Sequence, residues 1–193
     1  MSIKLYSTLT KSKEDFVPVD PNEVKIYLCG PTVYDLLHIG NFRGPVAFNL
    51  IRNWLEYRGY KVNFVYNYTD VDDKIIHKAI AQGISAQEVS EHFIEEFEKD
   101  FNRLGLKKHT HNPRVTTFMP QIIQFVQDLI ENKKAYEING EVFYEIETMN
   151  DYGKLSGKKI DELEAGQRVE VDVKKKNPAD FVLWKPAKES QPF

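Results

Sequence analysis

The feature that most constrains the fold is a pair of short apolar runs separated by a helical pattern. Residues 25–29 (Lys-Ile-Tyr-Leu-Cys) favour a buried strand, which ends at the strong break signal Gly30-Pro31. Apolar residues at helical spacing then predict a helix that stops near Gly59. Residues 61–66 alternate and are rich in β-branched and aromatic side chains, which predicts a second strand. This order predicts a right-handed crossover in a parallel sheet, as in doubly wound nucleotide-binding folds.

The later part of the chain predicts further helices and then a change of texture. A short helix is expected after Asp70 or Asp72, an amphipathic helix over residues 85–106, and another helix from Thr116. Asn139-Gly140 is the favoured two-residue turn of a β-hairpin. Strands are expected on both sides of this turn, at 135–138 and 141–146. An irregular polar segment over 147–180 and a last strand over 181–185 are expected to follow.

Composition narrows the classes of function. The formal net charge of −3 lacks the basic excess that is usual for a nucleic-acid-binding domain. The single cysteine, Cys29, excludes an intrachain disulfide and indicates the cytoplasm. No segment has the length and apolar character of a signal-peptide core or a membrane span, so no membrane partner is expected.

The segment between the first strand and the first helix carries the chemistry. Ligands of open α/β sheets bind at the carboxyl ends of the strands, where the next helix presents unpaired N–H groups to a phosphate. His38 and Asn41 are one helical turn apart and are expected to face that phosphate. Gly40 lacks the Cβ that would block a flat purine from the backbone. This segment therefore predicts a nucleotide site.

Other polar clusters indicate ordinary surface structure. His109 and His111 lie in a polar turn over 107–113, which favours a solvated loop over a metal pair. Three acidic residues precede or open the helix after the second strand: Asp70, Asp72 and Asp73. Carboxylates at a helix start favour capping and the helix dipole over a magnesium cluster. The basic run 174–176 is more typical of a solvated face than of an RNA contact.

Four segments carry a family resemblance. His38-Ile39-Gly40-Asn41 resembles the ATP-binding motif of class I aminoacyl-tRNA synthetases, in the form that ends with Asn. Residues 29–35 (Cys-Gly-Pro-Thr-Val-Tyr-Asp), 67–76 and 177–185 are similar to cysteinyl-tRNA synthetases in particular. The resemblance spans nearly the whole chain. It implies an α/β fold that is the first half of a Rossmann-like doubly wound parallel sheet, with a small α+β insertion, the connective polypeptide.

The resemblance also implies a division of the chain into three parts. Residues 1–115 would form the first half of the class I nucleotide-binding catalytic domain. Residues 116–180 would form the insertion, with its helix and β-hairpin. Residues 181–193 would return as a strand toward the second half of the catalytic domain.

The activity that the resemblance implies is the ATP-dependent ligation of cysteine to tRNA. Cysteine and ATP, with magnesium, form cysteinyl-adenylate, and the cysteinyl group then passes to the tRNA. His38 and Asn41 would be the catalytic pair, and with Gly40 they would bind ATP. Gly30, Thr32 and Thr69 would lie near the bound cysteine, although Thr69 also suits a helix cap. The enzyme would be a monomer that contacts tRNA mostly through domains that the chain does not contain.

Zinc is the cofactor implied by the resemblance. Cys29 would be the first of four protein ligands, and the other three would lie beyond the position equivalent to Phe193. A zinc ion selects a thiolate over a hydroxyl more sharply than a shaped pocket does. From the residues alone, a small buried thiol at the end of a strand, the commonest role of a lone cysteine, is favoured over a zinc ligand for Cys29.

The sequence departs from the family's full pattern and leaves alternatives open. It has 193 residues and contains no Lys-Met-Ser-Lys-Ser motif, so this chain alone is expected to be inactive. A cysteine:amino-sugar ligase of the mycothiol pathway would share the adenylation step. A non-catalytic nucleotide-binding module is a second alternative, and a nucleotidyltransferase with a related His-x-Gly-His loop is a third.

Overall fold

The computed structural model describes residues 2–157 and 175–187. The chain divides into two compact units. The first that we describe consists mainly of Val17–Met119, and the other contains Met1–Phe16 and Pro120–Glu189.

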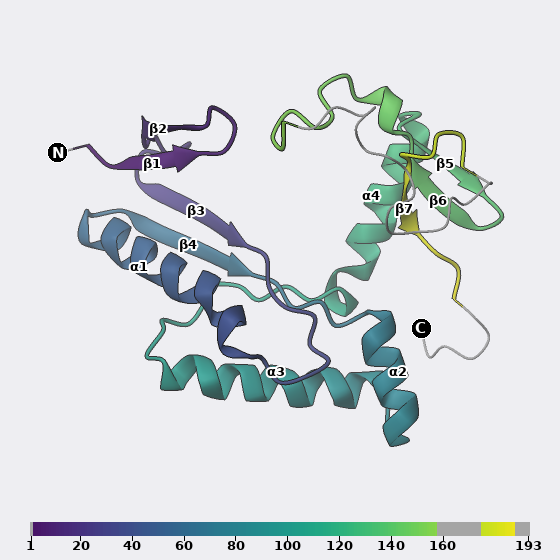
Figure 1. Ribbon diagram of the computed structural model, residues 1–193, viewed down its shortest axis with the longest axis horizontal. Coiled ribbons are helices and arrows are strands. Elements are labelled where there is room, and N and C mark those ends of the chain that lie inside the picture. Colours follow the sequence, from purple (N-terminus) through teal and green to yellow (C-terminus); the bar gives the residue numbers. More distant parts are fainter. Residues whose placement is uncertain (1, 158–174, 188–193) are drawn as a thin grey trace. The chain divides into compact units, whose positions relative to one another are not determined.

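A parallel strand pair forms the centre of the unit Val17–Met119. Strands β3 (Glu23–Leu28) and β4 (Lys61–Tyr66) pair in parallel along their whole length. The connection between them contains a 3-10 turn, η1 (Ile39–Phe42), and helix α1 (Arg43–Tyr57). The α/β class and the strand–helix–strand order expected from the sequence are therefore confirmed (Figure 1).

A third segment of backbone runs beside the other edge of β4. Parallel bridges join Val65 to His111 and Tyr68 to Arg114. The N–H of Tyr66 donates to the carbonyl oxygen of His111 at 3.0 Å. Residues 107–113 thus form a loop, as expected, but the end of this loop also pairs its backbone with β4, a role that its polar side chains conceal in the sequence.

Two capped helices follow β4. Helix α2 (Asp73–Gln82) begins at Asp72, whose side chain accepts a hydrogen bond from the N–H of Lys74 at 2.9 Å. Helix α3 (Ala86–Arg103) begins at a capping box in which Ser85 and Glu88 each accept a backbone N–H of the other. These caps satisfy donors that a helix start leaves unpaired.

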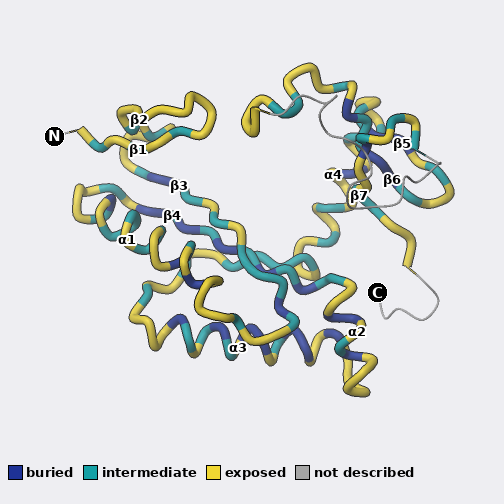
Figure 2. Tube along the Cα trace, viewed as in Figure 1, coloured by how far each residue is buried: buried dark blue, intermediate teal, exposed yellow. Residues whose placement is uncertain are grey.

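Helices α1 and α3 cover the same face of the sheet. Val62, Phe64 and Tyr66 are buried and alternate with less buried residues along β4. Figure 2 colours the trace by this burial. The ring of Phe97 on α3 stacks on Tyr66 with centroids 5.6 Å apart and on Phe42, next to α1, at 5.9 Å. This aromatic layer forms the core of the unit.

The second unit holds a small antiparallel sheet. Helix α4 (Met119–Glu131), which follows the 3-10 turn η2 (Thr116–Phe118), leads into strands β5 (Ala135–Ile138) and β6 (Glu141–Tyr144). The predicted hairpin is confirmed: Asn139 and Gly140 both have positive φ, as its turn requires. The 3-10 turn η3 (Ile146–Thr148) follows the hairpin, and the described residues continue to 157 and begin again at 175.

Strand β7 (Phe181–Trp184) pairs antiparallel with β6. The strand expected over residues 181–185 is confirmed, and hydrogen bonding along β6 joins it to the hairpin. That residues 181–193 return toward the second half of the catalytic domain stays a prediction. Residues 158–174 of the expected irregular segment, with Lys174, and residues 188–193 of the expected return strand lie outside the described residues.

The N-terminal residues of this unit form a hairpin that the sequence does not predict. Strands β1 (Lys4–Ser7) and β2 (Ser12–Asp15) pair antiparallel.

Within residues 2–157 and 175–187, no helix is both long enough and apolar enough to cross a membrane.

Candidate functional site

The loops that follow β3 and β4 are joined by backbone hydrogen bonds. The N–H of Thr69 donates to the carbonyl oxygen of Pro31 at 3.0 Å, and the N–H of Val33 donates to that of Thr69 at 3.1 Å. Thr32 and Thr69 form the parallel bridge between the two loops. Cys29 directly follows β3, just before this junction, as a free and exposed thiol. The structure therefore gathers the expected cysteine-site residues at the carboxyl ends of adjacent strands.

Gly30 is required by the close approach of these loops. A Cβ at this position would lie 1.6 Å from the backbone carbonyl oxygen of Asn67. A backbone atom cannot move aside as a flexible side chain can. The two strand ends can thus approach this closely only with glycine at position 30.

Asn67 belongs to this site, although the sequence analysis assigned it no role. Its Oδ1 accepts hydrogen bonds from the Gly30 N–H at 2.8 Å and from the Tyr27 hydroxyl at 3.0 Å. Its Nδ2 donates to Thr69 Oγ1 at 3.4 Å. The available signal was its place directly after a predicted strand, where side chains of open α/β sheets meet ligands.

His38 and Asn41 hold each other at the start of η1. The Nδ1 atom of His38 accepts the N–H of Gly40 at 3.1 Å, and Oδ1 of Asn41 accepts the N–H of His38 at 3.0 Å. Together these contacts form a capping box. The sequence predicts that both side chains face a phosphate, which stays a prediction; the structure shows each side chain hydrogen-bonded to the backbone at the start of η1.

The same contacts determine which atoms His38 and Asn41 can offer to a ligand. An Nδ1 atom that accepts a hydrogen bond leaves the ring proton of a neutral histidine on Nε2. An Oδ1 atom that accepts from the backbone leaves the Nδ2 group of Asn41 as a donor. Both groups thereby become hydrogen-bond donors, which suits an anionic phosphate.

Gly40 has a local reason to be glycine. A Cβ there would lie 2.8 Å from Cε1 and 3.0 Å from Nδ1 of His38. The imidazole ring therefore occupies the space beside Gly40. The approach of a purine to this glycine stays a prediction.

Helix α2 anchors the loop between the two clusters. Lys78 Nζ lies 3.1 Å from Asp35 Oδ1, and Lys74 Nζ lies 4.9 Å from the centroid of the Tyr34 ring. The hydrogen bond from Lys78 lowers the pKa of the Asp35 carboxyl, with a further contribution from the Leu36 N–H. The loop is thus tied to the helix that begins just after Thr69.

The acidic residues after β4 have structural partners. Asp70 is buried and accepts hydrogen bonds from the N–H and the hydroxyl of Thr116. Asp72 caps α2, as one of the two expected alternatives. Among the residues that the structure describes, no three histidine, cysteine or acidic side chains gather so that they could hold a metal ion. Cys29 is therefore a single donor there, whereas a zinc site needs at least three.

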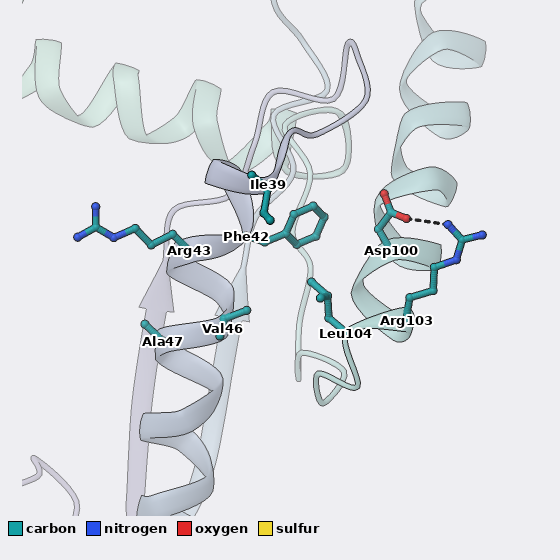
Figure 3. Close-up of a pocket in the computed structure, with 8 residues that line it drawn as sticks. All are labelled: Ile39, Phe42, Arg43, Val46, Ala47, Asp100, Arg103 and Leu104. Atoms are coloured by element: carbon teal, nitrogen blue, oxygen red, sulfur yellow. Dashed lines mark hydrogen bonds and ion pairs between the residues drawn. The ribbon is translucent and has the colours of Figure 1, made fainter.

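An apolar groove of about 580 Å³ lies between the start of α1 and the end of α3 (Figure 3). Ile39, Phe42 and Val46 line one side of it, and Leu104 lines the other. The residues that line the groove do not include His38, Asn41, Cys29 or Thr69. We therefore do not assign this groove to the nucleotide.

Two curated relatives are similar to this chain over almost all its length. A Cysteine--tRNA ligase of Bdellovibrio bacteriovorus is 56% identical over 189 residues, which make up 98% of this chain and 39% of the relative. A Cysteine--tRNA ligase of Carboxydothermus hydrogenoformans is 51% identical over 191 residues, or 99% of this chain and 41% of the relative. The chain thus spans about two fifths of these relatives' length.

Solved structures support the fold. One is the ternary complex of LeuRS, tRNA and LeuAMS from Agrobacterium radiobacter K84, with a TM-score of 0.54 and 18% identity over 68% of this chain and 18% of that chain. Another is a putative arginyl-tRNA synthetase from Campylobacter jejuni, with a TM-score of 0.54 and 13% identity over 70% of this chain and 40% of that one. At these identities the likeness concerns the fold alone.

The family assignment comes from a sequence match over most of the chain. The family described as "tRNA synthetases class I (C) catalytic domain" matches residues 15–193. Its match, the relatives and the geometry at the ends of β3 and β4 agree with the expectation from the four sequence segments. The chain belongs to the family of class I (C) tRNA synthetase catalytic domains.

Proposed function

We propose that this chain is the ATP- and cysteine-binding N-terminal portion of a cysteine–tRNA ligase. The complete enzyme would act in the cytoplasm as a monomer, activate cysteine with ATP and magnesium, and transfer the cysteinyl group to tRNA. The relatives at 56% and 51% identity support this assignment. The observation that carries it is the capping box that turns His38 Nε2 and Asn41 Nδ2 into paired donors.

In this proposal His38 and Asn41 bind the phosphates of ATP. Attack of a carboxylate on the α-phosphate develops charge on phosphate oxygens but needs no covalent help from the protein. Donors whose orientation is fixed before the ligand arrives stabilise that charge without further reorganisation. Gly40 contributes by leaving room for the His38 ring, which keeps Nδ1 on the backbone.

The cysteine substrate would bind where the loops after β3 and β4 meet. Gly30, Thr32 and Thr69 would surround it, and Cys29 would supply one ligand of a zinc ion. When bound, zinc would hold the substrate thiolate and thereby select it over a hydroxyl. The residues of this chain would position the amino acid for attack, because proximity and orientation supply much of the catalysis in such transfers.

Replacement of Asn41 by aspartate tests the nucleotide site. In Asn41→Asp, one oxygen can still accept the N–H of His38, but the outward donor becomes a negatively charged oxygen. We expect ATP–magnesium to bind more than about tenfold more weakly, because a charged hydrogen bond is lost and a repulsive charge is added. The thermal midpoint should change little. On the longest natural polypeptide that carries this sequence, isothermal titration calorimetry measures the ATP affinity and differential scanning calorimetry measures the thermal midpoint.

Asn102→Asp is the matched control for this charge change. Asn102 is exposed on α3 and takes no part in the capping box. Its replacement should leave ATP affinity within about twofold of the wild type, as expected for a single surface charge. Equal ATP affinity in Asn41→Asp and Asn102→Asp would contradict the proposed role of Asn41.

A further inference from the structure

The side-chain amide of Asn67 connects three groups at the ends of β3 and β4. The Gly30 N–H and the Tyr27 hydroxyl both donate to its Oδ1, at 2.8 and 3.0 Å. A backbone N–H can only donate, so the oxygen of the amide must face Gly30. The Nδ2 group therefore faces Thr69 Oγ1, 3.4 Å away.

This orientation determines the hydrogen-bonding role of Thr69. Its Oγ1 accepts from Asn67, so the hydroxyl hydrogen remains available for a different acceptor. The Thr69 backbone is held on both sides as well, since its N–H donates to Pro31 and its carbonyl oxygen accepts from Val33. Thr69 thus has a fixed backbone and a hydroxyl that can donate to a ligand.

We propose that Asn67 is a positioning residue of the cysteine site. It holds the backbone of Gly30 against β4 and directs the Thr69 hydroxyl to donate to an acceptor group of the bound amino acid. The inference rests on the proposed cysteine site and deepens it, because Asn67 acts through Gly30 and Thr69 rather than through contact with the substrate.

The Asn67 amide can both accept from the Gly30 N–H and donate to the Thr69 hydroxyl oxygen, whereas a carboxylate can only accept. An aspartate at position 67 would still accept from Gly30 and Tyr27. Its second oxygen would accept the hydrogen of the Thr69 hydroxyl and so reverse that hydrogen bond. An alanine at position 67 would abolish the hydrogen bonds to Tyr27, Gly30 and Thr69 alike.

Two variants separate the hold on the Gly30 backbone from the direction of the Thr69 hydroxyl. Both are made in the longest natural polypeptide that carries this sequence, and the protein is loaded with zinc. In Asn67→Asp, we expect about tenfold weaker binding of L-cysteine, while the hydrogen exchange of the Gly30 amide stays as slow as in the wild type. In Asn67→Ala, cysteine should bind more weakly and the Gly30 amide should also exchange about tenfold faster. ATP affinity should stay within about twofold in both. Titration calorimetry and residue-resolved hydrogen exchange measure these quantities.

A double-mutant cycle shows whether Asn67 acts through Thr69. In a Thr69→Val background, which lacks the hydroxyl, Asn67→Asp should weaken cysteine binding no further. Additive losses would overturn the inference, as would wild-type affinity for cysteine in Asn67→Asp or unchanged Gly30 exchange in Asn67→Ala. Each of those results leaves the proposed function standing if the wild type binds cysteine. A wild type that binds no cysteine overturns the proposed function, and this inference with it.

Discussion

Gly30 and Gly44 differ in what an added methyl group would meet. At Gly30 a Cβ would overlap the carbonyl oxygen of Asn67, whereas at Gly44 the nearest atom would be Leu28 Cδ1 at an ordinary 3.8 Å. We expect Gly30→Ala to lower the free energy of unfolding by about 3 kcal/mol, because the backbone must separate. Gly44→Ala lies in α1 and should raise it by up to about 1 kcal/mol. Urea unfolding of both variants measures the difference, and equal midpoints would contradict the close approach.

His109 gives the unfolding equilibrium a defined pH dependence. Burial lowers its pKa to about 4, although Glu98 acts in the opposite direction. Its ring stacks on Tyr66 and lies tilted against Phe101, with both centroids 4.6 Å away. The folded state therefore favours the neutral ring, and its contribution to stability is complete above the unfolded pKa of 6.5. It is lost as the pH falls from 6.5 toward 4.

The variant His109→Phe keeps an aromatic ring and removes this titration. Between pH 6.5 and 4 the wild type should lose stability more steeply than the variant, by at most about 1.4 kcal/mol per pH unit. Chemical denaturation at several pH values measures the two slopes. Parallel curves over this range would show that the folded protein does not disfavour the charged ring.

At the residue scale, the sequence predicts site positions better than their partners. Cys29, Gly30 and Thr69 lie at the ends of strands that the sequence predicts, whereas their assignment to a cysteine site rests on the family resemblance and stays a prediction. The hydrogen bond between Gly30 and Asn67 joins residues 37 positions apart, and only the register of the parallel pair brings them together. The same reason conceals His109, whose aromatic neighbours come from β4 and α3.

Among the elements, β7 depends on one buried carboxylate. Asp180 is 1% exposed and accepts hydrogen bonds from the Tyr136 hydroxyl at 2.6 Å, the Ile146 N–H at 2.9 Å and the Asn177 N–H at 3.1 Å. In Asp180→Ala these three donors lose their acceptor. We expect the loss of about 3 kcal/mol of stability in the unit that contains β5, β6 and β7.

Asp180→Asn is the matched control, because it keeps one oxygen acceptor in the same shape. The free energy of unfolding of Asp180→Asn should fall between that of the wild type and that of Asp180→Ala. Hydrogen exchange of the β6 amides reports on this unit separately from the parallel sheet. Unchanged exchange in Asp180→Ala would show that the carboxylate does not hold β7 in place.

Elements with a strong periodic pattern are predictable, and weakly patterned ones are not. Residues 61–66 alternate between buried and less buried positions, and the predicted strand coincides with β4. Strand β2 has the sequence Ser-Lys-Glu-Asp and is exposed throughout, so it has no apolar face to detect. Its turn contains Lys11 at φ 55° instead of the glycine or asparagine that usually signals a hairpin.

At the scale of the whole molecule, we expect the 193-residue chain to supply only part of the proposed site. Among the described residues no group of three possible metal ligands accompanies Cys29, and the sequence contains no Lys-Met-Ser-Lys-Ser motif. We therefore expect the purified chain to show no cysteine-dependent exchange between ATP and pyrophosphate. Exchange above the level without cysteine would contradict this expectation. The Cysteine--tRNA ligase of Bdellovibrio bacteriovorus, assayed in parallel, is the positive control.

The fold class is predictable at this scale because one crossover unit determines it. A strand, a helix and a strand with a short loop before the helix allow essentially one handedness and one sheet type. The place of the last strand was not predictable, since its apolar run suits either sheet. Pairing with β6 depends on contacts around Asp180 that a local pattern does not contain.

The near-contact between position 30 and the carbonyl of Asn67 has a genetic consequence. Every missense change in the Gly30 codon adds at least a Cβ, so each of them meets the same backbone oxygen. A compensating change in the Asn67 side chain cannot relieve the overlap, because the obstructing atom belongs to the main chain. Purifying selection on this codon should therefore act against all replacements alike, whatever their polarity or size.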